Sequence, residues 1–184
     1  MRCFISINVP LDIKKKIEEF EHNLVKQIQF NWVVPDNFHL TLKFLDEIQR
    51  DQIEALKKTC ATIKEAPFSL SLKQLILFPS TASPRVLAIH LEGELEKLQR
   101  LKKQIDKHGL TVGFPGENRD FSPHITLARI KKLGEVKKIY PYLNHDFALD
   151  FKVSSFALMS SILTREGAQY ELIKKFLLRG ESGE

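Results

Sequence analysis

The sequence predicts an α+β fold made of two related lobes within one bilobal domain, residues 1–184. Segments whose apolar residues recur every second position alternate with segments whose apolar residues recur every three or four, so strands alternate with helices. A strand–helix–strand pattern occurs once in each half. Its second strand carries the same type of tetrapeptide each time, first His39-Leu40-Thr41-Leu42 and, 85 residues later, His124-Ile125-Thr126-Leu127. This repetition indicates related lobes rather than independent domains.

The first half of the chain predicts two strands and two helices. Residues 2–9 alternate between two sides, which is typical of a strand, and Pro10 and Asp12 then begin a helix. A loop over 31–37 leads to a strand over 38–45 and a second helix over 47–65. The apolar positions of the first helix are three or four residues apart, as in an amphipathic helix: Ile13, Ile17, Phe20, Leu24 and Ile28.

The second half repeats this alternation and ends in a hairpin. Two strands, a third helix marked by Leu95, Leu98, Leu101 and Ile105, and a Gly-rich loop precede the strand that carries the second tetrapeptide. A turn at 164–167 has the composition of a hairpin connection. The predicted ranges are strands over 68–78, 85–91, 121–130, 147–159 and 168–178, a loop over 108–120 and a short helix near 133–143.

Composition and charge narrow the class of protein. A chain that is 43% hydrophobic and 28% charged is ordinary for a folded protein, and its two cysteines cannot form a disulfide framework. No apolar run approaches the ~20 residues that cross a bilayer, and the N-terminus predicts a strand rather than a signal peptide, so we expect a cytoplasmic protein without membrane contact. The net charge of +5 favours anionic partners such as nucleic acid, although most lysine clusters are expected on solvated helix faces.

The two tetrapeptides carry the chemistry. On a strand, alternation turns His39 and Thr41 to one face and their neighbouring leucines to the other, and the second copy does the same with His124 and Thr126. If the lobes face each other, two imidazoles and two hydroxyls converge on one cleft. Imidazoles titrate near ~6.5, so near neutral pH one can accept a proton while the other donates one, and threonine hydroxyls can bind phosphate oxygens.

Several neighbouring residues keep two interpretations. Arg129 lies three residues after Thr126, which on an ideal strand is the opposite face. A bulge or the end of the strand would turn it to a phosphate; otherwise it is a surface cation. Lys43 shares the face of His39 and Thr41 and either contacts an RNA phosphate or is solvated. Phe4 either stacks on a base or fills the core, and Trp32 is expected to pack.

We expect no metal and no cofactor. Two histidines could form half of a zinc site, but a catalytic zinc ion usually has three protein ligands. The sequence contains no His-x-x-x-His or Cys-x-x-Cys spacing, no Gly-x-Ser-x-Gly elbow and no phosphate-binding Gly-Lys-Ser/Thr loop.

Nearly the whole chain resembles a known family. The opening RCFISINVP, the block NWVVPDNFHLTLKFLDEI, the hairpin LILFPSTASPRVLAIHL, the block FSPHITLARI and the closing LMSSILTREGAQYELIKKFLL are similar to segments of the two-histidine (2H, LigT-like) phosphoesterases. Within these, the chain is most similar to the RNA 2′,3′-cyclic phosphodiesterases, also known as 2′-5′ RNA ligases. Two positions depart from the family pattern. Asp46 replaces a glycine, which is expected to change a turn, and Ala88 replaces a tryptophan, which is expected to change a packing or substrate contact.

The resemblance implies pseudo-symmetric lobes of antiparallel sheet flanked by helices around a central active-site cleft. It implies metal-independent opening of the 2′,3′-cyclic phosphate at the end of an RNA or oligonucleotide to a 2′-phosphate, with ligation as the reverse reaction. His39 and His124 would then be the acid–base pair, with His39 protonating the departing O3′ and His124 activating water. Thr41 and Thr126 would bind phosphate. A monomer is expected.

Two other functions stay open at this point. The same cleft could hold a nucleotide or RNA end without turnover, as a binding module. It could also hydrolyse another cyclic or 2′-5′-linked nucleotide. Segments 78–85 and 109–120 are expected to determine this specificity.

Overall fold

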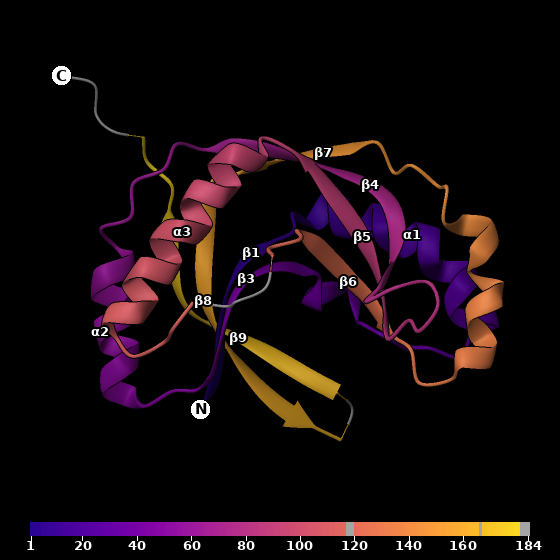
Figure 1. Ribbon diagram of the computed structural model, residues 1–184, viewed down its shortest axis with the longest axis horizontal. Coiled ribbons are helices and arrows are strands. Elements are labelled where there is room, and N and C mark those ends of the chain that lie inside the picture. The colour runs from indigo at the N-terminus through magenta and orange to yellow at the C-terminus, as the bar shows by residue number, and fades with distance from the viewer. Residues whose placement is uncertain (117–119, 166, 181–184) are drawn as a thin grey trace.

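The computed structural model describes residues 1–116, 120–165 and 167–180, which form one antiparallel sheet flanked by helices (Figure 1). Residues 117–119 of the predicted loop and Glu166 of the predicted turn lie outside this part of the chain. The strands are β1 (Arg2–Asn8), β2 (Asn31–Trp32), β3 (His39–Glu47), β4 (Phe68–Phe78), β5 (Val86–Gly93), β6 (His124–Arg129), β7 (Leu149–Val153), β8 (Ser155–Thr164) and β9 (Gly167–Leu177). The α-helices are α1 (Leu11–Gln27), α2 (Arg50–Cys60) and α3 (Leu95–Thr111), and the 3₁₀-helices are η1 (Pro35–Asn37), η2 (Leu133–Lys138) and η3 (Tyr140–Tyr142).

The strand order shows the predicted pseudo-symmetry. The strands are ordered β7-β4-β5-β6-β3-β1-β8-β9, with β2 paired to β6. The two strands that carry the repeated tetrapeptides, β3 and β6, are therefore neighbours at the centre. In one half α1 connects β1 to β3, and in the other α3 connects β5 to β6. The predicted α+β fold with two related halves is confirmed, and hydrogen bonding joins the halves into one continuous sheet.

The sheet is strongly curled. β7 and β8 are separated by Ser154 alone, yet they stand six positions apart in the strand order. In a flat sheet six spacings of about 4.8 Å would separate them by roughly 29 Å, far more than one residue can span. The single strand predicted over 147–159 is therefore wrong, because the chain moves there from one half of the sheet to the other. The single short helix predicted near 133–143 is also wrong, because two 3₁₀-helices, η2 and η3, occupy this range.

The core lies on the face of the sheet opposite the histidines. Leu40, Leu42, Ile125 and Leu127 are all buried in it, which confirms the alternation predicted for both tetrapeptides. The helices add apolar faces to the same cluster, through Ile17 of α1 and comparable positions of α2 and α3. Burial of such side chains supplies about 1.5–3 kcal/mol each, so the strands that carry the polar residues are held from behind.

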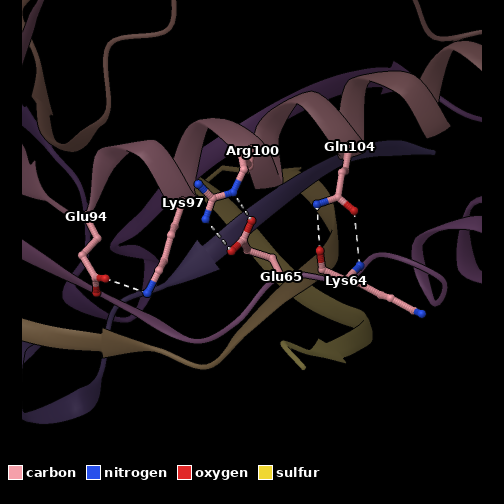
Figure 2. Close-up of polar contacts among 6 residues, drawn as sticks. All are labelled: Lys64, Glu65, Glu94, Lys97, Arg100 and Gln104. Carbon is pink, nitrogen blue, oxygen red and sulfur yellow. Dashed lines mark hydrogen bonds and ion pairs between the residues drawn. The ribbon is translucent and has the colours of Figure 1, made fainter. Parts of the chain in front are cut away.

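Polar contacts fix α3 against the segment that precedes β4 (Figure 2). Arg100 of α3 donates two hydrogen bonds to the Glu65 carboxylate, at 3.0 and 3.1 Å. One turn further, the Gln104 side chain exchanges two hydrogen bonds with the backbone of Lys64. α3 also contacts α2, β3 and β4. The helix that leads to the second histidine is thus attached to the strand that carries the first.

Two further observations concern the predicted environment. No helix in the described ranges is both long and apolar enough to span a membrane. Cys3 and Cys60 are both buried and free, and burial raises the pKa of each thiol, to about 11 for Cys60.

Candidate active site

The site is a cavity where β3 and β6 diverge. A single residue pair, Leu40 and Ile125, joins these two strands in the ladder, and β2 pairs with the later part of β6. The cavity has a volume of about 540 Å³. It contains His39, Thr41, Thr126 and Arg129 among its lining residues, together with the tip of the β8–β9 hairpin. The structure therefore brings together four of the five predicted site residues in one concave space.

The two histidines have matching geometry. Nδ1 of His39 lies 2.6 Å from the carbonyl oxygen of Asn37, and Nδ1 of His124 lies 2.8 Å from that of Ser122, in both cases two residues earlier in the chain. A carbonyl oxygen can only accept a hydrogen bond, so Nδ1 carries the proton in both rings. Each neutral imidazole therefore keeps its Nε2 lone pair. In His39 this nitrogen accepts a hydrogen bond from the Thr41 hydroxyl at 3.0 Å.

The surroundings of the two rings differ. His39 packs on Phe4, with ring centroids 4.9 Å apart, and meets the edge of Tyr170 at 5.3 Å. Burial lowers the pKa of His39, the hydrogen bond to the Asn37 carbonyl raises it, and electrostatic interactions with the Lys14 ammonium group and with His124 lower it further. His124 does not line the cavity itself. Its ring lies against Phe78, 4.7 Å between centroids, at the start of the predicted specificity segment 78–85.

A bulge within each tetrapeptide strand reverses its alternation. In β3, Thr41 pairs with Ser6 and Lys43 with Ile5, so Leu42 is an extra residue. In β6, an equivalent shift between its pairings with Leu87 and Ala88 makes Leu127 extra. After each bulge the next residue turns inward and the following one turns to the cavity. The residues presented to the cavity in this way are Phe44 and Arg129.

This sheet, with a histidine–threonine pair on each central strand, can be compared with known proteins. The sequence model of the family described as "LigT like Phosphoesterase" matches the chain twice, over residues 7–88 and 89–170, one match for each half. The chain belongs to the LigT-like phosphoesterase family. The double match corresponds to the internal pseudo-symmetry, because each half carries one histidine–threonine pair.

Known proteins are similar to this LigT-like phosphoesterase over nearly its whole length. A protein of Aquifex aeolicus named RNA 2′,3′-cyclic phosphodiesterase is 32% identical over 98% of this chain and 98% of its own. One of the same name from Thermus thermophilus is 33% identical over 100% of this chain and 93% of its own. A crystal structure of a Thermus thermophilus protein superposes with a TM-score of 0.84 at 30% identity, covering 98% of this chain and all of that one. E. coli LigT complexed with 3′-AMP gives 0.79 at 25% identity, covering 96% and 97%.

The bulges determine the direction of two cationic side chains, Arg129 and Lys43, whose direction the sequence left open. Arg129 lines the cavity despite its odd spacing from Thr126, so its guanidinium is available to a ligand there. The prediction for Lys43 is wrong, since it does not share the face of His39 and Thr41. Lys43 is 1% exposed, and its ammonium group donates to the Asp106 carboxylate at 3.0 Å and to the Pro115 carbonyl at 2.6 Å. It connects β3 to α3 and to the predicted specificity segment 109–120, and it is not among the residues that line the cavity.

Three aromatic residues belong to the site more closely than their sequence context indicates. Phe44 and Tyr170 line the cavity, and neither was predicted as a site residue. Trp32 packs on Phe30, as predicted; it also donates its indole N–H to the Ile28 carbonyl and lines the cavity. Phe4 is buried with Ala157 and Met159 in a small cluster beneath His39, which favours its packing interpretation. Phe44 was not predicted because nothing in the sequence marks the bulge that turns its side chain to the cavity.

The two departures from the family pattern have different environments. Asp46 has φ of +50°, a backbone conformation that glycine adopts freely and other residues adopt at a cost. Asp46 lies within β3 and pairs with Cys3 next to a register shift, so this conformation belongs to an irregularity of the strand and not to the expected turn. Ala88 is completely buried and pairs with Thr126 across the ladder. Within the described ranges, no group of three or more histidine, cysteine or acidic side chains could hold a metal ion.

Proposed function

We propose that this LigT-like phosphoesterase hydrolyses the 2′,3′-cyclic phosphate at an RNA 3′ end to a 2′-phosphate, with no metal ion. The observation that carries the proposal is the pair of imidazoles, each held by a backbone carbonyl with Nε2 as its reactive nitrogen. Thr41, Thr126 and Arg129 line the same cavity as His39. The names of the relatives and the 3′-AMP complex of E. coli LigT support the same substrate class.

The reaction needs two proton transfers on opposite sides of phosphorus. Nε2 of His124 accepts a proton from water as the water oxygen bonds to phosphorus. The bond from phosphorus to O3′ breaks, and Nε2–H of His39 donates its proton to O3′. The products are a 2′-phosphate and a free 3′-hydroxyl. Each positioned acid or base typically contributes about 10²–10⁴ in rate.

The remaining residues act on the charge of the phosphoryl group. The Thr41 hydroxyl, which donates to Nε2 of His39 in the free protein, turns to a non-bridging oxygen when substrate enters. Thr126 and the Arg129 guanidinium contact the same group of oxygens. With the 5′-hydroxyl of a second RNA in place of water, the same groups form a 2′-5′ linkage, which accounts for the ligase activity implied by the resemblance.

The acid role of His39 depends on the substrate. Burial keeps this imidazole neutral in the free protein at neutral pH. The negative charge of a bound phosphate beside Nε2 raises its pKa again, because an anion favours the imidazolium. Protonation of His39 is therefore coupled to substrate binding.

Product analysis tests the proposal. Protein treated with EDTA is incubated with a short RNA that ends in a 2′,3′-cyclic phosphate, and the 2′-phosphate, 3′-phosphate and unchanged RNA are separated. We expect the 2′-phosphate at an undiminished rate. Tight binding without product would indicate a binding module. Neither binding nor product would indicate another cyclic or 2′-5′-linked nucleotide, and activity restored only by zinc would contradict the metal-free mechanism.

A further inference from the structure

A second, smaller cavity adjoins the active site at His39. Asn37, His39 and Tyr170 line both cavities. Two polar side chains from other elements also line the smaller one, Asn8 at the end of β1 and Lys14 near the start of α1. Its volume is about 130 Å³, against about 30 Å³ for one water molecule in the liquid, so it has room for a phosphate group.

Lys14 brings a positive charge to this second cavity. Among the residues that the structure describes, its ammonium donates one hydrogen bond, to the backbone carbonyl of Asp36 at 2.5 Å, although an ammonium can donate three. Burial lowers the pKa of Lys14, because the charged form loses hydration, and the Asp36 carboxylate raises it in part. A bound anion offsets the lost hydration, so Lys14 favours an anionic ligand in this cavity.

Asn8 adds a neutral donor beside this charge. Its side-chain oxygen lies 3.5 Å from the Ser6 hydroxyl, which leaves the amide N–H groups for a ligand. An ammonium and an amide suit the two non-bridging oxygens of a phosphodiester, which together carry one negative charge. The Asp36 carboxylate lines the same cavity and opposes an anion, but it is exposed, so solvent and salt screen it.

The proposed reaction places the rest of an RNA on this side of the site. His39 protonates O3′, so the ribose that carries O3′ lies on the His39 side of phosphorus and the attacking water lies on the His124 side. The next phosphodiester of the RNA is attached to the 5′ carbon of that same ribose. The cavity that adjoins the larger one at His39 is therefore the nearest described space with a cation for this phosphodiester.

We infer that Lys14, with Asn8, binds the phosphodiester on the 5′ side of the terminal nucleotide, so that the enzyme prefers an RNA or oligonucleotide to a mononucleotide. The inference rests on the proposed function for the identity of the ligand as an RNA end. A phosphate at Lys14 also offsets the electrostatic effect of this ammonium on His39, which favours the protonated form that the reaction needs.

Binding of two non-reactive dinucleotides tests the inference without turnover. Both end in a 2′-phosphate, and they differ only in the linkage, which is a phosphodiester in one and an uncharged methylphosphonate in the other. Each is titrated by calorimetry into wild-type protein, Lys14→Gln and Lys15→Gln. Lys15 is exposed on α1 and does not line either cavity, so Lys15→Gln removes the same charge as a matched control.

The quantity compared is the ratio of the two Kd values in each protein. The effect of Lys14 on His39 is common to both ligands and cancels in this ratio. We expect the wild-type protein and Lys15→Gln to bind the phosphodiester about tenfold more tightly, the lower end of what a charged hydrogen bond contributes, and Lys14→Gln to reduce the ratio to within about twofold of one. A wild-type ratio near one, an unchanged ratio in Lys14→Gln, an equal loss in Lys15→Gln, or no binding of either dinucleotide to wild-type protein would overturn the inference.

The outcome is separable from that of the proposed function. A protein that opens the cyclic phosphate but has the same ratio in wild-type and Lys14→Gln refutes the second phosphate site alone. A protein that cannot open it, but whose tenfold ratio is lost in Lys14→Gln, refutes the proposed reaction alone.

Discussion

Glu21 offers a test of the energetics of the fold that is independent of substrate. This carboxyl lies on the buried face of α1 beside Ile17 and Leu24 and is 3% exposed. Its Oε2 finds no hydrogen-bond partner in the described part of the chain. Burial, with a smaller contribution from the charge of Glu18, raises the pKa of Glu21 from 4.5 to about 8. The folded protein therefore holds a proton there that the unfolded chain releases.

The magnitude can be worked out from the shift. A raised pKa in the folded state means that stability is greatest at low pH and falls as pH rises from 4.5 to about 8. Each pH unit within that window costs about 1.4 kcal/mol. At pH 7 the wild-type protein has therefore lost about 3 kcal/mol relative to pH 4.5. Glu21→Gln removes this titration. The buried amide can change the free energy of unfolding as well, but that change is the same at every pH.

Urea unfolding followed by circular dichroism measures the effect. The free energy of unfolding is determined for wild-type protein and Glu21→Gln between pH 4.5 and 8.5, and the two curves are subtracted so that all other titrations cancel. Between pH 4.5 and pH 7 we expect the free energy of unfolding of the variant to increase by about 3 kcal/mol relative to that of the wild-type protein. Glu19→Gln, on the exposed side of α1, is the matched control. A difference curve that is flat for both variants would refute the burial argument.

Other perturbations test single features of the site. Asp46→Gly should stabilise the fold by about 1 kcal/mol in the same unfolding assay, because glycine adopts the positive φ without strain, and a loss of stability would contradict this. Lys14→Gln should raise the pKa of His39, because the Lys14 ammonium lowers it, and should move the corresponding limb of the pH–rate profile to higher pH; a shift to lower pH would count against that electrostatic role. Arg129→Ala should lower kcat/KM about 10- to 150-fold, with Arg129→Lys restoring part of it, since a charged hydrogen bond contributes about 1.5–3 kcal/mol. Unchanged kinetics in Arg129→Ala would leave this residue as a surface cation.

The inward and outward alternation of the two tetrapeptides was predictable because it depends on local periodicity alone. Leu40, Leu42, Ile125 and Leu127 are buried as predicted. The direction of the next side chains along each strand was not predictable. Neither Leu42 nor Leu127 carries a bulge signal such as glycine, since the extra residue arises from the register that each strand adopts with its partner. The prediction for Lys43 failed for this reason, and Phe44 was missed.

Contacts between distant parts of the chain were the second feature that the sequence could not predict. The apolar alternation of Phe151 and Val153 changes phase at Ser154-Ser155, where β7 ends and β8 begins, but such a change of phase does not by itself show that the chain moves to another part of the sheet. That break is a consequence of the curl of the whole sheet. The cavity likewise combines Trp32, Phe44 and Leu163, which come from distant parts of the chain. Only the folded sheet brings such residues together.

The central claim is that two imidazoles carry the reaction, and substitution of each tests it most directly. Rates of opening of an RNA 2′,3′-cyclic phosphate are measured for wild-type protein, His39→Ala, His124→Ala and the double variant, each checked for folding by circular dichroism. We predict that each single variant folds and loses a factor of at least about 10²–10⁴ in kcat, and that the double variant is hardly worse, because the two residues act as a unit. A folded single variant that retains wild-type activity would contradict the account.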